Sequence, residues 1–205
     1  MKIVITGSNG YIGKHVVDYL KTTDNQILAI GSDRCESYNY PLDFSTYDIF
    51  SGSKNIYDEL GKPDLCIHLA WKDGFVHNSR AHMEYLSSHV RFLYDLIDGG
   101  IPSISVMGTM HEVGYYEGAI NENTPCNPMS QYGIAKRSLY LSLVNYAKNT
   151  QCTIKWLRAY YIMGDYRKTK NIFSKILEAA DANKTEFPFN SGKNQYDFID
   201  VDDLS

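Results

Sequence analysis

Two residues that could transfer protons, Tyr132 and Lys136, lie four positions apart in the segment SQYGIAKRSL. The surrounding pattern predicts a helix, and this spacing places both side chains on one helical face. A phenol normally titrates near pH ~10, and a neighbouring ammonium group stabilises the phenolate, so the pair could exchange protons at neutral pH. Because the chain has 17 tyrosines, the spacing alone is weak evidence, and its interpretation depends on the rest of the sequence.

A second motif lies near the amino terminus, where three glycines occur in KIVITGSNGYIGKHVV between an expected strand and an expected helix. Glycine permits a tight turn, a close approach to a pyrophosphate and close helix–strand packing. The helix N-terminus adds backbone amide donors and the positive end of a dipole. We therefore expect a dinucleotide to bind here. The expected phosphate-binding residues are Gly7, Asn9, Gly10, Tyr11, Ile12 and Gly13.

The end of the second expected strand bears on which dinucleotide fits. An acidic residue roughly 20 positions beyond the loop would bind the ribose 2′-hydroxyl of NAD, but Gly31 stands there. Ser32 and Arg34 follow and could donate to the 2′-phosphate of NADP, so NADP is slightly preferred over NAD. Asp33 weakens this preference, because a shift of one or two residues would present its carboxylate to NAD. The four residues could also form only a solvated turn.

Strand-like runs alternate with helical patterns along most of the chain, and these elements must position the two motifs. Apolar or β-branched runs predict strands at 2–6, 26–30, 64–70, 103–107 and 153–158. Helical spacing predicts helices at 11–22, 80–98, 130–148 and 171–183. This alternation predicts right-handed βαβ crossovers and an α/β fold with a doubly wound parallel sheet. We expect residues 1–164 to form this dinucleotide-binding domain and residues 165–205 to begin a small substrate-binding lobe.

The composition argues against several classes of function. The formal net charge is -4 with mixed signs, so no basic surface is expected to attract nucleic acid. No leader-like segment follows Met1, and no apolar run reaches membrane-spanning length. We therefore expect a cytoplasmic protein without membrane or nucleic-acid partners. No metal site or disulfide framework is expected either, because four cysteines are widely spaced, namely Cys35, Cys66, Cys126 and Cys152.

Together these motifs resemble those of the extended short-chain dehydrogenases/reductases, the NAD-dependent epimerase/dehydratase family that modifies nucleotide sugars. TGSNGYIG is similar to the family's glycine loop, and the order from this loop to YxxxK also matches. The resemblance covers essentially the whole chain, through LDF at 42–44, PDLCIHLAW at 63–71, LRAYYIMG at 157–164 and DFIDVDDL at 197–204. It implies a Rossmann fold, an NAD or NADP cofactor and a nucleotide-sugar substrate.

The resemblance also implies roles for individual residues. Asp43 matches the position that contacts adenine in the family. In GTMHEVG, Thr109 matches the family's catalytic Ser or Thr. The hydroxyl of that residue would hydrogen-bond the substrate oxygen and share the proton with Tyr132. Lys136 would hold the nicotinamide ribose as well as assist the tyrosine. The implied catalytic residues are Thr109, Tyr132 and Lys136, and the further cofactor contacts are Ser32, Arg34, Asp43, Phe44, Leu69, Ala70 and Lys136.

The residues after Thr109 limit the reactions that the site could catalyse. Family dehydratases have Asp-Glu there to eliminate water, whereas this chain has Met110 and His111, and a methionine cannot transfer protons. His111 could act as an acid or base, although a lone histidine is more often structural. We expect an enzyme that reduces a 4-keto-6-deoxy sugar nucleotide, with a nucleotide-sugar 4-epimerase or a non-catalytic NADP-binding scaffold as alternatives. Because relatives continue for about another hundred residues, we expect the chain to be either truncated or a minimal form of the enzyme. A homodimer is a further expected possibility.

Overall fold

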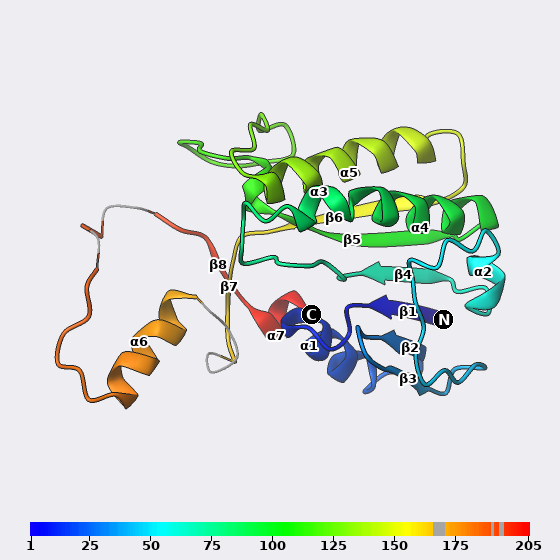
Figure 1. Cartoon of the computed structure of the whole chain (residues 1–205), viewed down its shortest axis with the longest axis horizontal. Helices are drawn as coiled ribbons and strands as arrows, with labels where there is room; N and C mark the ends of the chain where they lie inside the picture. The colour runs from blue at the N-terminus through cyan, green and yellow to red at the C-terminus, as the bar shows by residue number, and fades with distance from the viewer. Residues whose placement is uncertain (166–170, 190, 193–194) are drawn as a thin grey trace. The chain divides into compact units, whose positions relative to one another are not determined.

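The computed structural model describes residues 1–165, 171–189, 191–192 and 195–205. They form two compact units, Met1–Ala159 and Tyr160–Ser205 (Figure 1). In the described part of the chain, none of the helices combines the length and the apolar character needed to cross a bilayer.

A six-stranded sheet forms the centre of the first unit, in the order β3-β2-β1-β4-β5-β6 (Figure 1). β1 (Lys2–Thr6), β2 (Gln26–Ile30), β4 (Leu65–His68), β5 (Ser103–Thr109) and β6 (Thr153–Ala159) run parallel and confirm the five expected strands. The sequence predicts no strand at β3 (Cys35–Tyr38), which pairs antiparallel with β2. This edge strand forms because the Gly31 amide donates to the Arg34 carbonyl over 2.8 Å and reverses the chain.

Different helices cover the two faces of the sheet, because alternate side chains of a strand point to opposite faces. Ile3 and Ile5 of β1 pack with α1 (Tyr11–Leu20) on one face. Val4 points the other way, into a core shared with α4 (Leu86–Gly99) and α5 (Gln131–Ala147) (Figure 1). With helices on both faces, the first unit has the doubly wound α/β architecture that the sequence predicts.

The remaining elements are short. The helix expected at 80–98 is divided at Tyr85 into α3 (Ala81–Glu84) and α4. α2 (Ile56–Glu59) and the 3-10 helix η1 (Met110–Glu112) were not predicted. In the second unit, β7 (Tyr161–Met163) pairs with β8 (Phe198–Asp200), and α7 (Val201–Leu204) follows β8. α6 (Ile172–Asp181) confirms the helix expected at 171–183.

The strand order creates a topological switch point between β1 and β4. From β1 the chain continues to β2 and β3 on one side, and it then returns to build β4, β5 and β6 on the other. In open α/β sheets, ligands bind in the crevice beyond the carboxyl ends of strands at such a point. The residues that follow β1, β2, β4 and β5 are therefore the ones that the fold assembles into a site.

Candidate active site

The glycine loop is packed too closely for larger residues. Gly7 turns the chain out of β1 with a φ of +74°, and an added Cβ would lie 2.6 Å from the Ala70 amide nitrogen. A Cβ on Gly13 would lie 2.2 Å from the Gly7 carbonyl oxygen. The glycines thus allow α1, the loop and the residues after β4 to approach one another. This contact places Leu69 and Ala70, two of the residues expected to contact a cofactor, beside the loop.

The start of α1 is suited to an anion. Gly10 occupies the N-cap position, so no side chain caps the first turn, and this turn carries no acidic residue. Gly10 itself donates to the Gly7 carbonyl over 3.0 Å, which fixes the loop beneath the helix. The amides at the start of a helix and the positive end of its dipole favour a phosphate. Tyr11 and Ile12 open this turn, so the loop fits the pyrophosphate of a dinucleotide.

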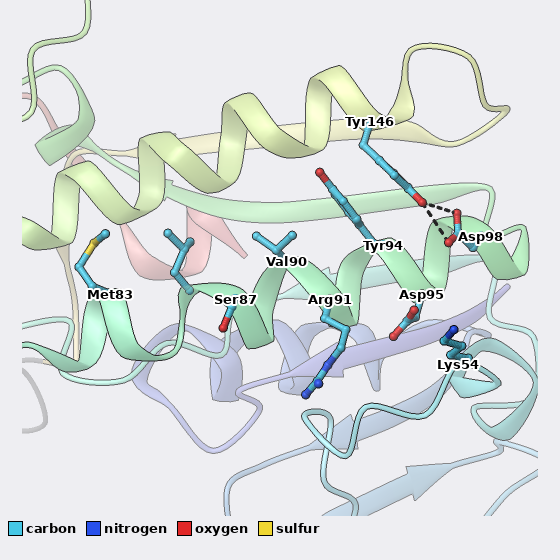
Figure 2. Close-up of a pocket in the computed structure, with 10 residues that line it drawn as sticks. Lys54, Met83, Ser87, Val90, Arg91, Tyr94, Asp95, Asp98 and Tyr146 are labelled. Atoms are coloured by element: carbon cyan, nitrogen blue, oxygen red, sulfur yellow. Dashed lines mark hydrogen bonds between the residues drawn. The ribbon is translucent and has the colours of Figure 1, made fainter.

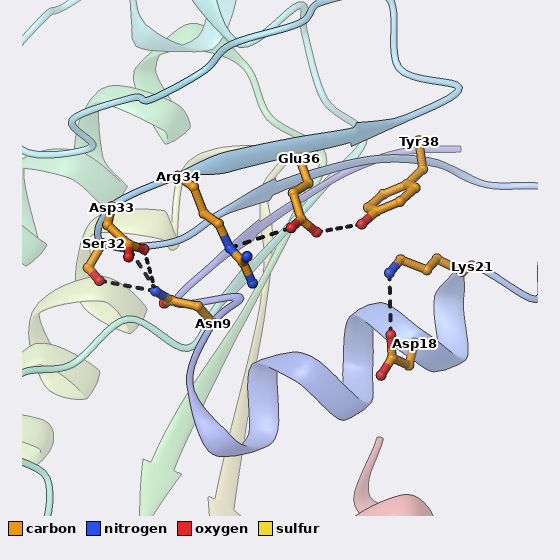
Figure 3. Close-up of polar contacts among 8 residues, drawn as sticks. All are labelled: Asn9, Asp18, Lys21, Ser32, Asp33, Arg34, Glu36 and Tyr38. Carbon is orange, nitrogen blue, oxygen red and sulfur yellow. Dashed lines mark hydrogen bonds and ion pairs between the residues drawn. The ribbon is translucent and has the colours of Figure 1, made fainter.

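Asn9 links the glycine loop to the end of β2 (Figure 3). Its side-chain nitrogen donates to the Ser32 hydroxyl over 3.1 Å and to the Asp33 carboxylate over 2.8 Å. An added Cβ on Gly31 would lie 2.9 Å from the Asn9 amide carbon. A larger residue at Gly31 would therefore displace the Asn9 side chain from this position.

A cavity of about 340 Å³ lies beside this link and includes the expected residue Arg34 (Figure 3). The Arg34 guanidinium forms an ion pair with Glu36 over 3.4 Å, and the Tyr38 hydroxyl donates to the same carboxylate. Arg34 is thus partly neutralised rather than left as an isolated cation. The cavity is lined by Ser8, Asn9, Lys14, Val17, Asp18, Lys21, Arg34, Glu36 and Tyr38.

Asp43 and Phe44 lie in the loop that follows β3. The Ser37 hydroxyl of β3 donates to the Asp43 carboxylate over 3.0 Å, and Asp43 is exposed. Phe44 packs against the core, with its ring centroid 5.2 Å from that of Tyr47. The structure thus leaves the Asp43 carboxylate accessible and makes Phe44 part of the loop's packing.

The three expected catalytic residues converge from two elements. Thr109 ends β5, and Tyr132 and Lys136 lie in the first turns of α5. The Ser130 hydroxyl caps this helix by accepting from the Gly133 amide over 3.2 Å. The Thr109 side chain interacts with the Tyr132 phenol and acts to lower its pKa. The Lys136 ammonium donates to the Met107 carbonyl over 2.8 Å, so in this structure the lysine bonds to β5.

Burial dominates the electrostatics of this group. It raises the pKa of Tyr132 to about 12. The Thr109 side chain opposes this rise, and the charge of Glu112 adds to it. Burial lowers the pKa of Lys136 to about 7, against the attraction of Glu112. In this structure burial outweighs any effect of Lys136 on Tyr132, so the expected shift of the Tyr132 pKa into the neutral range stays a prediction. The phenol is held protonated, and the lysine titrates near neutral pH.

Glu112 is a site residue that the sequence interpretation missed. Its carboxylate is fully buried and accepts from the Thr109 amide over 2.8 Å and from the Trp156 indole over 2.9 Å. Arg158 lies 3.6 Å away as its counter-ion. Glu112 thereby fixes Thr109 and supplies a negative charge near Lys136. The spacing of Thr109 and Glu112 matches a capping box, which is the sequence signal that could have identified it.

Two histidines flank Tyr132. The ring centroids of His77 and His111 lie 4.0 Å apart, and that of His111 lies 5.6 Å from the Tyr132 ring. The His77 carbonyl accepts from the Tyr132 amide over 2.9 Å. Burial and the neighbouring His77 lower the pKa of His111. Among the described residues, no group of three His, Cys, Asp or Glu side chains could hold a metal ion.

The chain is similar to known proteins over its full length. The family described as NAD dependent epimerase/dehydratase matches residues 3–205. The dTDP-6-deoxy-L-talose 4-dehydrogenase (NAD(+)) of Aggregatibacter actinomycetemcomitans is 43% identical, over 100% of this chain and 77% of that protein. The UDP-glucose 4-epimerase of Lactobacillus helveticus is 23% identical, over 100% of this chain and 69% of that protein.

Solved structures share the fold. MoeE5 in complex with UDP-glucuronic acid and NAD superposes with a TM-score of 0.80 at 23% identity, covering 100% of this chain and 69% of that one. UDP-glucuronic acid 4-epimerase from Bacillus cereus, in complex with UDP-glucuronic acid and NAD, gives a TM-score of 0.79 at 21% identity, covering 100% and 70%. With the family match and the 43% identical relative, these findings show that the chain belongs to the NAD-dependent epimerase/dehydratase family of nucleotide-sugar-modifying enzymes.

Proposed function

We propose that the protein is an oxidoreductase that interconverts the 4-ketone and the 4-hydroxyl of a nucleotide-linked 6-deoxy sugar. The observation that carries this proposal is the convergence of Thr109, Tyr132 and Lys136 without an Asp-Glu pair after Thr109. Such a set suffices for hydride transfer at a carbinol or ketone carbon, because it supplies one proton donor and acceptor. The name of the 43% identical relative, a dTDP-sugar 4-dehydrogenase, supports the same chemistry in the opposite direction.

The proposed binding site for the cofactor uses the loop and the strand ends. The amides at the start of α1 would hold the pyrophosphate, and Lys136 would bind the nicotinamide ribose. Asp43 and Phe44 would lie toward the adenine, and Leu69 and Ala70 would border the loop. When bound, a nicotinamide dinucleotide supplies the hydride donor for reduction or the acceptor for oxidation.

Tyr132 would donate the proton to the substrate oxygen in reduction and accept it in oxidation. In reduction, C4 gains a hydride, and the ketone oxygen takes the proton of the Tyr132 hydroxyl to become an alcohol. The Thr109 hydroxyl would hold the same oxygen and the phenol together. A pKa of about 12 keeps Tyr132 in the phenol form, which is the form that donates. This protonation state suits the step in which Tyr132 donates a proton during reduction, and the phenolate left behind would be stabilised by the Lys136 ammonium.

We propose NAD as the cofactor. The preference for NADP that the sequence suggested stays a prediction, and the contacts at the end of β2 weigh against it. Arg34 is paired with Glu36, and the Asp33 carboxylate held by Asn9 would repel a 2′-phosphate. The NAD(+) dependence in the name of the 43% identical relative points the same way. Fluorescence titrations with NADH and NADPH test this, and tighter binding of NADPH would contradict it.

We also propose that the second unit, Tyr160–Ser205, belongs to the sugar-binding lobe expected at 165–205. Its described part carries a cluster of aromatic rings, in which the Tyr161 and Tyr196 centroids lie 4.5 Å apart and the Phe173 and Phe198 centroids 5.6 Å apart. Tyr196 remains 45% exposed, and exposed aromatic faces are suited to stacking on bases and sugars. Loss of nucleotide-sugar affinity in Tyr196→Ala, with NADH binding retained, would support this assignment, and unchanged affinity would refute it.

A homodimer through α4 and α5 is a further proposal. A hollow of about 690 Å³ lies over α4 and Tyr146 of α5, and none of the expected site residues lines it (Figure 2). The outer sides of α5 and the neighbouring α3 expose apolar groups, including Leu141 of α5 at 53% and Met83 of α3 at 45%, and exposed apolar surface is typical of interfaces. Light scattering after gel filtration tests this, with Leu141→Glu expected to give monomers. A monomeric wild type would refute the proposal.

Variants of the catalytic set test the reaction. Tyr132→Phe should lower turnover by roughly 10²–10⁴-fold, the usual contribution of a positioned acid or base, while NADH binding is kept. Tyr146→Phe is the matched control, because it removes a phenol hydroxyl from the same helix whose partner is Asp98. Turnover is followed by NADH absorbance with a dTDP-4-keto-6-deoxy sugar. Wild-type turnover in Tyr132→Phe would end the catalytic assignment.

A nucleotide-sugar 4-epimerase is the second candidate, because the same three side chains could serve it and the similar solved structures include epimerases. The assay separates the two reactions. A reductase consumes NADH in proportion to product, whereas an epimerase converts a 4-hydroxyl sugar into its epimer with no net change in NADH. A non-catalytic scaffold would retain cofactor binding and show neither result.

A further inference from the structure

The indole of Trp71 lies against the ammonium group of Lys136. The Lys136 nitrogen is 3.9 Å from the Trp71 ring centroid, within the range of a cation–π contact. The same nitrogen donates to the Met107 carbonyl over 2.8 Å. Lys136 is only 2% exposed, so these two partners, rather than bulk water, solvate its charge. The position of the catalytic amine therefore depends on an aromatic face.

Trp71 is itself fixed along its edge. Its indole N–H donates to Nδ1 of His82 over 3.0 Å, and Nε2 of His82 lies 2.9 Å from the Val76 carbonyl oxygen. A carbonyl can only accept, so Nε2 of His82 carries the hydrogen, and Nδ1 is left as the acceptor that the indole needs. Both contacts require the same tautomer. The edge of the indole is thus anchored to the loop that precedes α3.

The face of Trp71 is fixed by a second histidine. The rings of Trp71 and His89 stack at 4.4 Å with an interplanar angle of 20°. His89 is hydrogen-bonded to His68 over 2.9 Å, and His68 to the Thr6 hydroxyl over 2.8 Å. Burial and the Lys136 charge lower the pKa of His89 to about 3. His89 is therefore neutral, so it supports the indole without repelling the ammonium group.

We propose that Trp71 is a positioning residue for Lys136, holding the ammonium group between its indole face and the Met107 carbonyl. The effect on the reaction that we assign to Trp71 passes through Lys136. The inference deepens the proposed function, because its catalytic consequence depends on the role assigned to Lys136. The contact itself can be tested in the protein without substrate or cofactor.

The charge balance around Lys136 gives the contact a measurable effect. The titratable groups that face or neighbour it are His68 on β4, His89 on α4, Glu112 on η1, and Tyr132 on its own helix. Burial lowers the pKa of Lys136 to about 7, and Glu112 opposes this shift. The indole face also favours the ammonium form. Removing that face while keeping the site apolar should therefore lower the pKa further.

The test is an NMR titration of ¹³C-lysine-labelled protein without ligands, with the Lys136 signal assigned by Lys136→Arg. Trp71→Leu should lower the Lys136 pKa by roughly 0.4–1.5 pH units, the shift that corresponds to the usual range of cation–π contacts. Trp71→Phe keeps an aromatic face and should remain near the wild-type value. Tyr85→Leu is the matched control, because it removes a ring that lies 4.9 Å from the exposed Lys72 ammonium instead.

Several outcomes would overturn the proposal. An unchanged or raised Lys136 pKa in Trp71→Leu would show that the ring acts only by excluding water, and equal shifts in the Leu and Phe variants would assign the effect to the indole N–H. An equal shift in Tyr85→Leu would also refute it. If Trp71→Leu does not fold, Trp71→Met provides a second side chain without an aromatic face, with the same expected shift.

The proposed function is tested separately. In turnover, Trp71→Leu should move the alkaline limb of the kcat profile to lower pH, whereas Trp71→Phe should leave it in place. If Lys136→Ala keeps wild-type turnover, the catalytic role of Lys136 fails even when the NMR titration supports the contact. A lower Lys136 pKa in the NMR titration, without any change in the alkaline limb of the pH profile of kcat, would overturn the link to catalysis.

Discussion

Replacing Glu112 by glutamine should destabilise the first unit by roughly 3 kcal/mol, at the lower end of the cost of breaking a buried ion pair. The glutamine oxygen can still accept from the Thr109 amide and the Trp156 indole, which approach one carboxylate oxygen at 2.8 and 2.9 Å, although the indole also lies 3.1 Å from the other oxygen. The other oxygen becomes an NH₂ group facing Arg158 at 3.6 Å, so two donors oppose each other. We expect the lower end of this energy range because Arg158 is 17% exposed, so water can replace part of the lost contact.

Glu36→Gln is the matched control for this prediction. Glu36 forms a similar ion pair with Arg34 at 3.4 Å, but the two side chains are 39% and 59% exposed. Exposed pairs contribute about 0–1 kcal/mol, so this variant should stay close to wild type. Urea unfolding followed by tryptophan fluorescence reports on the first unit, because both tryptophans of the chain, Trp71 and Trp156, lie in it.

A loss of stability below about 1 kcal/mol in Glu112→Gln, the upper limit for an exposed pair, would refute this prediction, as would equal losses in Glu112→Gln and Glu36→Gln. Either result would mean that burial of the carboxylate does not set the strength of its interactions. The comparison is direct, because the two substitutions are chemically identical and each removes a charge paired with an arginine.

Three other predictions concern Gly13 in the glycine loop, Gly31 at the end of β2 and the buried His89. Gly13→Ala should weaken NADH binding and lower the stability by about 1–3 kcal/mol each, because its Cβ would lie 2.2 Å from the Gly7 carbonyl oxygen. Calorimetry measures the binding, and urea unfolding measures the stability. Gly74→Ala is the control and should change neither, because there is open space around Gly74. Gly31→Asp should weaken NADH and NADPH binding alike in fluorescence titrations by displacing Asn9, and a simple change of preference would contradict this. Stability should fall as the pH drops from about 6.5, because the unfolded chain protonates His89 near its ordinary pKa of ~6.5 whereas the folded protein does so only at about 3. His89→Gln should flatten this fall in urea unfolding by up to ~1.4 kcal/mol per pH unit, and an unchanged slope would refute it.

The sequence was sufficient wherever local chemistry determines structure. The spacing of glycines between an apolar run and a helical pattern predicts the loop, because only glycine permits those contacts in any context. The spacing of Tyr132 and Lys136 predicts a shared helical face for the same local reason. Alternation of strands and helices then predicts the doubly wound sheet, since a parallel sheet buries both faces. These features depend on neighbours along the chain.

Tertiary structure decided the electrostatics and the partners. The sequence places Lys136 near Tyr132, but only the fold brings Trp71, Met107 and Glu112 to its amine from separate elements. The antiparallel edge strand β3 likewise depends on a turn closed by the Gly31 amide. The pKa of Tyr132 rises rather than falls because burial costs the charged form more than neighbouring groups return. Burial is a property of the whole packed domain, so the residue types and their spacing could suggest a catalytic set but not its protonation states.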